Sequence, residues 1–199
     1  MKPDRLNALT DGVVAIAITI MVLEIRIPAE SSLAALKATA PVFGTYLLSF
    51  LNIALFWNNH HHMMATADRV DGRLLWANMM MLFFISLLPF TMRWIDKAGI
   101  APWPLAAYGI VLLGGSIGYK LIASSVIRLH PDGTLARAVG SDLKGNATVA
   151  AYVVAIGLSF VIPIGAIVIY VLNALVWLIP DRRVEEQLIE EHQDGGPKR

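Results

Sequence analysis

The feature that most constrains this chain is a series of long apolar runs separated by short charged segments. An α-helix needs roughly 20 mostly apolar residues to cross a bilayer. Six candidate runs occupy residues 9–27, 39–58, 74–94, 104–127, 147–162 and 164–179. Charged residues make up 16% of the chain and apolar ones 56%, against about 25% and 45–50% in soluble domains. We therefore expect an all-α integral membrane protein with six transmembrane helices.

The boundaries of the runs leave one ambiguity. The second run is expected to continue as a helix through the histidines at 60–62. The fifth and sixth runs are short and meet at Ile162-Pro163. Because proline cannot continue a helix and restricts the residue before it, this join predicts a hairpin. One long kinked helix is the competing interpretation.

The distribution of lysine and arginine predicts the orientation. With six spans, twelve of the sixteen basic residues fall on the side of the two termini and four fall on the other side. Five spans would divide them eight against eight. Because cytoplasmic loops carry the excess of Lys and Arg, both termini are expected in the cytoplasm, which favours the hairpin.

The domain organisation follows from the same runs. Residues 1–180 are expected to form one six-helix transmembrane domain, and residues 181–199 a short charged cytoplasmic tail. The chain has no cysteine, which excludes disulfides and cysteine-ligated metal. Its net charge of +1 provides no basic surface for nucleic acid. No nucleic-acid partner and no cofactor are expected.

The first run, LTDGVVAIAITIMVLEI, carries one apolar stripe. At about 100° per residue, Ile16, Thr19, Ile20 and Leu23 fall within an arc of about 100°. Periodicity alone favours a face that packs in the core or against lipid. A second interpretation is a pore face, on which stacked apolar rings gate by dewetting and Thr19 adds a ring of hydroxyls.

Asp11 lies about 140° from Ile16 and so belongs to another face of the same helix. Ionisable residues inside membrane spans are rare and are usually paired. Arg5 and the histidines at 60–62 are candidate partners, because the antiparallel second span brings its end to the depth of Asp11. A structural tie between the two helices is the favoured interpretation, ahead of a proton relay and an incidental charge.

Three other features carry weaker signals. Consecutive histidines point about 100° apart and cannot all bind one ion, so no metal site is expected. Glu24 is interpreted as a water-satisfied interfacial charge, with a cation-attracting extracellular mouth as the alternative. The seven asparagines that fall in or near the runs are expected to hydrogen-bond between helices: Asn7, Asn52, Asn58, Asn59, Asn78, Asn146 and Asn173.

Several stretches together resemble a known family. Arg5, followed by Leu9-Thr10-Asp11 and GVVAIAITIMVLEI, resembles the first helix of the bacterial relatives of the lysosomal potassium channel transmembrane protein 175. FWNNHHHMM at 56–64, LLPFTM at 87–92 and WLIPDRR at 177–183 resemble later segments of that family. The family's Phe-Ser-Asp reads Leu9-Thr10-Asp11 here, and Thr10 keeps the hydroxyl.

The resemblance implies a homotetrameric, potassium-preferring cation channel of the bacterial plasma membrane, with helix one lining the pore. It implies constrictions at Ile16, Ile20 and Leu23, and a hydroxyl ring at Thr19. It also implies an intrasubunit polar network, whose expected members are Arg5, Thr10, Asp11, Trp57 and His61.

Two rival functions stay open at this point. A proton-conducting channel or a proton-coupled secondary transporter would use Asp11 and His61. A membrane-embedded hydrolase is disfavoured, because nothing like a nucleophile elbow accompanies the available Ser, His and Asp residues.

Overall fold

The computed structural model describes residues 2–25, 27–28, 30–130 and 142–178, and these residues are helical apart from short connections. The helices are α1 (Asp4–Leu23), α2 (Leu33–Ala38), α3 (Ala40–Ala65), α4 (Gly72–Ser86), α5 (Leu88–Ala98), α6 (Pro102–Leu129), α8 (Leu143–Leu158) and α9 (Pro163–Leu178). The expectation of an all-α chain is therefore confirmed for the described residues.

Four helical segments are long and apolar enough to cross a membrane: Asp4–Leu23, Ala40–Ala65, Gly72–Ala98 and Pro102–Leu129. The third combines α4 and α5, which are separated at Leu87. Pro89 lies in the first turn of α5. Since proline lacks an N–H and its ring crowds the preceding turn, it accounts for this break. The apolar helices α8 and α9 have 16 residues each, or about 24 Å of length.

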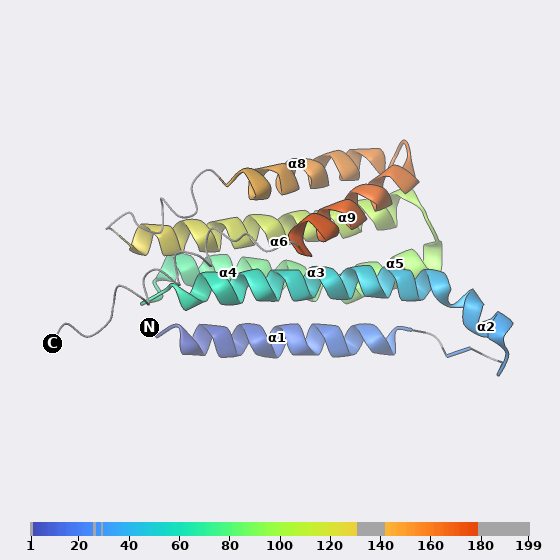
Figure 1. Ribbon diagram of the computed structural model, residues 1–199, viewed down its shortest axis with the longest axis horizontal. Helices are drawn as coiled ribbons and strands as arrows, with labels where there is room; N and C mark the ends of the chain where they lie inside the picture. The colour runs from blue at the N-terminus through green and yellow to red at the C-terminus, as the bar shows by residue number, and fades with distance from the viewer. Residues whose placement is uncertain (1, 26, 29, 131–141, 179–199) are drawn as a thin grey trace.

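The helices run side by side as a bundle (Figure 1). α1 lies along one edge and contacts α3, α4 and α5. α4 and α6 form the central pair, and α8 and α9 cover α6 on the side away from α1. The start of α1 shares one end of the bundle with the start of α4, the end of α6 and the start of α8 (Figure 1). We call this the basic end, because it carries Lys2, Arg5, Arg69, Arg73, Lys120, Arg128 and Lys144.

The helix boundaries refine the sequence expectations. The first run was expected over 9–27, but α1 begins at Asp4 and ends at Leu23. Asp11 is therefore about two turns inside the helix, not two residues from its start. α3 continues through the histidines to Ala65, as expected. α8 and α9 are separate helices that pack against each other, so the join at Pro163 forms a hairpin and not one kinked helix. The tail at 181–199 lies outside the described residues.

Aspartate side chains cap two helices at the basic end. The carboxylate of Asp71 accepts a hydrogen bond from the backbone N–H of Leu74 at 2.9 Å and begins α4. The carboxylate of Asp142 accepts one from Gly145 at 2.8 Å and begins α8. Both satisfy donors that the first turn of a helix leaves unpaired, which fixes where these helices begin.

Candidate functional site

α1 has two contrasting faces. Its buried face packs on the bundle and consists of Leu6, Thr10, Val14, Ala17 and Met21. The predicted stripe lies on the other side, where Ile16, Ile20 and Leu23 are 59%, 43% and 81% exposed in the single chain. Thr19 is exposed on the same side, and its hydroxyl donates to the backbone carbonyl of Ile16 at 2.9 Å. The hydroxyl proton is thus used within the helix, so the oxygen remains available as an acceptor.

Asp11 is tied to the second long helix by a tryptophan. The Nε1–H of Trp57 on α3 donates to the Asp11 carboxylate at 2.8 Å. The ring of His61, one turn further along α3, stacks on the Trp57 ring with centroids 5.6 Å apart. Three of the predicted network residues therefore form a chain of contacts, from Asp11 through Trp57 to His61. A charge-assisted hydrogen bond from an indole N–H orients the carboxylate and holds α1 against α3.

A second contact of α1 is fully buried. Thr10 is 0% exposed, and its hydroxyl donates to the carbonyl of Leu6 at 3.0 Å. The same oxygen accepts a hydrogen bond from Nδ2 of Asn78 on α4 at 3.1 Å. Sequence reasoning treated Asn78 as one of seven equivalent asparagines, since the pairing of α1 with α4 has no signature in the sequence.

His60 and Arg5 complete this region in different ways. His60, the residue before the predicted His61, is buried, and its Nε2 has no hydrogen-bond partner among the described residues. Arg5 is exposed at the start of α1 and, within the described part of the chain, forms no ion pair with Asp11. The structure therefore joins Asp11, Trp57 and His61 between α1 and α3, whereas Thr10 is buried against α4 and Arg5 lies apart at the start of α1.

At the other end of α1, Glu24 is held by a residue that sequence reasoning did not consider. Arg93 on α5 donates from Nη1 to Glu24 Oε1 at 2.9 Å. The sequence neighbour Arg26 lies outside the described residues. The Glu24–Arg93 pair joins the end of α1 to α5. Leu23, with its 81% exposed side chain, directly precedes it.

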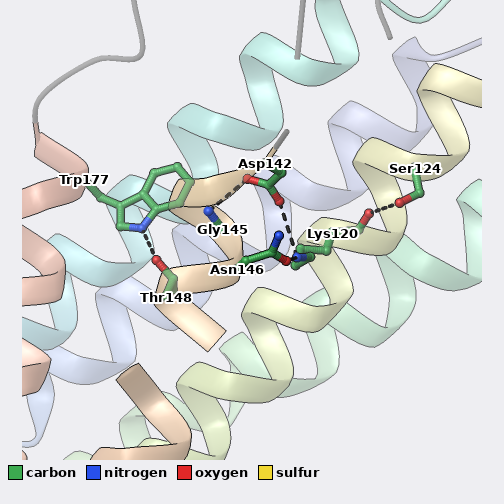
Figure 2. Close-up of polar contacts among 7 residues, drawn as sticks. All are labelled: Lys120, Ser124, Asp142, Gly145, Asn146, Thr148 and Trp177. Carbon is green, nitrogen blue, oxygen red and sulfur yellow. Dashed lines mark hydrogen bonds and ion pairs between the residues drawn. The ribbon is translucent and has the colours of Figure 1, made fainter. Parts of the chain in front are cut away.

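A further polar cluster lies where α6, α8 and α9 meet, as Figure 2 shows. Lys120 on α6 hydrogen-bonds to Asn146 Oδ1 and lies 3.5 Å from the Asp142 carboxylate. Trp177 on α9 donates to the Thr148 hydroxyl at 2.7 Å. The Lys120 contacts fasten α8 to α6, and the Trp177–Thr148 bond joins α9 to α8 within the hairpin. Their signal in the sequence was weak, namely Asp142 three residues before a glycine and a lone lysine inside an apolar run.

The fold and the polar contacts define a polytopic helical membrane protein. The comparisons with known proteins identify its family. The sequence profile of the family described as "Endosomal/lysosomal potassium channel TMEM175" matches residues 5–89. A Chryseobacterium protein named as a potassium channel is 43% identical over 191 residues, which is 96% of this chain and all of the relative. The chain belongs to the TMEM175 family, which confirms the resemblance seen in the sequence.

Two further matches are a human relative and a solved bacterial structure. A human protein named "Endosomal/lysosomal proton channel TMEM175" is 31% identical over 101 residues, covering 45% of this chain and 20% of the human protein. The crystal structure described as that of a lysosomal potassium-selective channel TMEM175 homolog from Chamaesiphon minutus matches with a TM-score of 0.74. That match covers 89% of this chain and 96% of the other at 24% identity, and it supports the fold.

Proposed function

We propose that copies of this chain assemble around a shared axis, as a homotetramer, into a potassium-preferring cation channel. Ions would pass down their electrochemical gradient without a cofactor. The choice of ion is supported by the name of the Chryseobacterium relative, which matches along its whole length. Residues 1–180 would form the channel domain and residues 181–199 a cytoplasmic tail.

The observation that carries this proposal is the exposed apolar face of α1. This helix lies at the edge of the bundle (Figure 1), and it packs within the chain through its opposite, buried face. Ile16, Ile20 and Leu23 are left for a neighbour. Around a central axis, each would be repeated as an apolar ring. Rings of this kind form constrictions that gate by dewetting.

Thr19 supplies the polar element of this face. Because its proton is donated to the backbone, its oxygen can accept a partly dehydrated cation between the Ile16 and Ile20 rings. Hydroxyls and apolar rings replace a hydration shell less completely than stacked carbonyls do. We therefore expect a preference for potassium over sodium that is modest. Glu24 would lie near the extracellular mouth, where its pairing with Arg93 reduces its attraction for cations.

The proposed topology has six crossings in the bacterial plasma membrane, with both termini in the cytoplasm. The α8–α9 hairpin provides the last two. At about 24 Å each, these helices are shorter than the roughly 30 Å hydrocarbon core, so the bilayer would have to thin locally around them. The basic end of the bundle then faces the cytoplasm, in agreement with the excess of Lys and Arg.

A proton-conducting channel or a proton-coupled transporter is the second candidate. The printed name of the human relative favours protons. Asp11, Trp57 and His61 are contiguous, and the unpartnered Nε2 of His60 is buried nearby. If protons pass through Asp11, the Asp11→Asn variant should lose proton flux while its potassium flux persists. Flux that saturates and depends on a pH gradient would indicate a transporter.

The test is flux from liposomes containing the purified protein, with potassium, sodium and proton movement measured under an imposed potential. Channel-rate, potassium-preferring flux is expected. Leu23→Ser should raise it severalfold, because a polar ring no longer dewets. Leu172→Ser on α9 is the matched control, since Leu172 is 54% exposed but lies on another helix, and its flux should equal that of the unmodified chain. Unchanged flux in a correctly assembled Leu23→Ser protein would reject the pore face.

A further inference from the structure

A groove opens on the outer surface between α4 and α6 at the basic end of the bundle. Its lining includes Arg73, Trp76 and Met80 on α4, Leu121, Ser124 and Arg128 on α6, and the cap residue Asp71. None of them belongs to the predicted pore face or to the polar network of α1. We call this surface the α4–α6 groove.

The groove lies next to the level at which α4 and α6 approach each other most closely through glycine. At Gly118 a side chain would meet the backbone of Met81 at 2.7–2.8 Å, so the helices touch there through their backbones. Towards the basic end, longer side chains replace the glycine on α6. The close contact closes the inner end of the groove, and its other end opens at the helix termini.

Polarity changes along the length of the groove. Arg73, Ser124 and Arg128 lie towards the helix termini, while Met80 and Leu121 lie towards the closed end. Seven residues separate Arg73 from Met80 and Leu121 from Arg128, which corresponds to about 10 Å along each helix. The charged part therefore lies at the level where both helices leave the apolar layer, and the apolar part lies inside it.

The charged part carries a net positive charge. Asp71, the cap of α4, lies 2.5 Å from Nη2 of Arg128 and neutralises one guanidinium group. Arg73 forms no ion pair within the described ranges of the chain. Trp76, one turn deeper, is 75% exposed. Tryptophans with exposed rings are enriched where apolar and polar parts of a bilayer meet, so Trp76 marks the interface.

We infer that the α4–α6 groove binds one anionic phospholipid. Arg73 would hold the phosphate-containing headgroup, with the Asp71-paired Arg128 beside it, and an acyl chain would lie against Met80 and Leu121. The complementarity is twofold. A net positive charge faces the negative headgroup, and the polar-to-apolar order of the groove matches that of the lipid. Basic pockets between helices at the cytoplasmic surface are known to suit such headgroups.

The test is lipid retention by the purified, detergent-solubilised full-length protein, measured by native mass spectrometry. The probes are dioleoylphosphatidylglycerol and the zwitterionic dioleoylphosphatidylcholine. Arg73→Gln should lower retention of phosphatidylglycerol about fivefold, the effect expected from one basic residue near an anionic surface. Retention of phosphatidylcholine should not change.

Arg69→Gln is the matched control, since Arg69 is an exposed arginine at the same end but does not line the groove. It should retain phosphatidylglycerol as the unmodified protein does. If Arg69→Gln and Arg73→Gln lost phosphatidylglycerol retention equally, the effect would come from the overall surface charge and not from the groove, and the proposal would be overturned. Unchanged retention in Arg73→Gln would also overturn it. Since Arg73 is exposed, the variant should keep the helix content of the parent, which circular dichroism checks.

A second comparison separates a lipid from a free phosphate. Leu121→Gln makes the apolar part of the groove polar at a residue that is 45% exposed, without altering the charge. It should lower retention of the dioleoyl lipid and leave retention of the short dihexanoyl analogue unchanged. Displacement of the dioleoyl lipid by millimolar inorganic phosphate would instead show a headgroup-only site and would reject the phospholipid. These readouts involve no ion flux, so they stand or fall separately from the proposed channel activity.

Discussion

The first two long helices and the next two are held in the bundle by different means. In α4–α5 and in α6, 50% of the most apolar stretch is buried within the chain. In α1 and α3 the values are 28% and 17%. α4 and α6 approach through backbone at Gly118, whereas α1 depends on separate side-chain contacts such as Asp11–Trp57 and Thr10–Asn78. The central pair is therefore a scaffold, and α1 and α3 leave most of their surface for other partners.

The difference in burial indicates which helices have surface available for contacts between chains. Van der Waals packing and hydrogen bonds drive helix association in membranes, because lipid is as apolar as leucine. A helix that is mostly exposed in one chain must find that packing elsewhere or face lipid. Discrete polar contacts fix the position of α1 while keeping its opposite face open. That combination suits the helix that we propose lines a shared axis.

The largest effect should come from disturbing the central pair. In Gly118→Ala the new methyl group would lie 2.7 Å from the Met81 amide nitrogen and 2.8 Å from its Cα. Backbone cannot move aside as a flexible side chain can, so we expect a loss of about 3 kcal/mol, the upper part of the overpacking range. Thermal melting in detergent, followed by circular dichroism, measures it.

Gly44→Ala is the control for that experiment. Gly44 also lies inside a helix, but a methyl group there has nothing within 4 Å. Replacing a helical glycine by alanine should then stabilise α3 by up to about 1 kcal/mol. If the two variants shifted the melting temperature equally, the close approach of α4 and α6 would not be what holds the central pair together.

An intermediate effect is expected from the buried contact of α1. Thr10→Val keeps the shape of the side chain but removes the oxygen that accepts from Asn78, leaving a buried amide without this bond. The expected loss is about 1 kcal/mol, because hydrogen bonds inside membrane proteins contribute modestly. Thr19→Val provides the comparison, since Thr19 is exposed and bonds only its own helix. A loss for Thr19→Val as large as that for Thr10→Val would erase the distinction between the two faces.

The sequence predicted what repeats along the chain and missed what depends on pairing between helices. The long apolar runs fixed the helical class, and α3 continues through the histidines as expected. Periodicity separated the Ile16 stripe from Asp11, and in the structure the stripe is exposed while Asp11 bonds to α3. The break at Leu87 was not foreseen, since the run at 74–94 is mostly apolar and Pro89 was counted as part of it.

Contacts between distant residues lay beyond the reach of periodicity. Trp57 was expected near Asp11 only from the family resemblance, and Arg93 was not considered as the partner of Glu24. Asn78 could not be distinguished from the other asparagines, because its partner Thr10 is 68 residues away. The roles of Ile16, Ile20, Leu23 and Thr19 in conduction stay predictions, since a single chain has no pore axis.

The smallest effect should come from the exposed ion pair that joins the ends of the central helices. The backbone N–H of Leu74 and the guanidinium of Arg128 lower the pKa of Asp71 below its usual value of 3.8. A carboxyl group with a lowered pKa in the folded state stabilises the fold when ionised. This contribution is present above the unfolded-state pKa and is lost as the pH falls through the folded-state value.

Asp71→Asn should therefore lower the melting temperature slightly at pH 7, and the difference from the unmodified protein should shrink below about pH 4. Glu30→Gln, which alters an exposed carboxylate outside the helices, should show no such convergence. A difference between Asp71→Asn and the parent that persisted unchanged to pH 2 would mean that the loss does not come from the charge of Asp71, and would reject a stabilising role for its ion pair with Arg128.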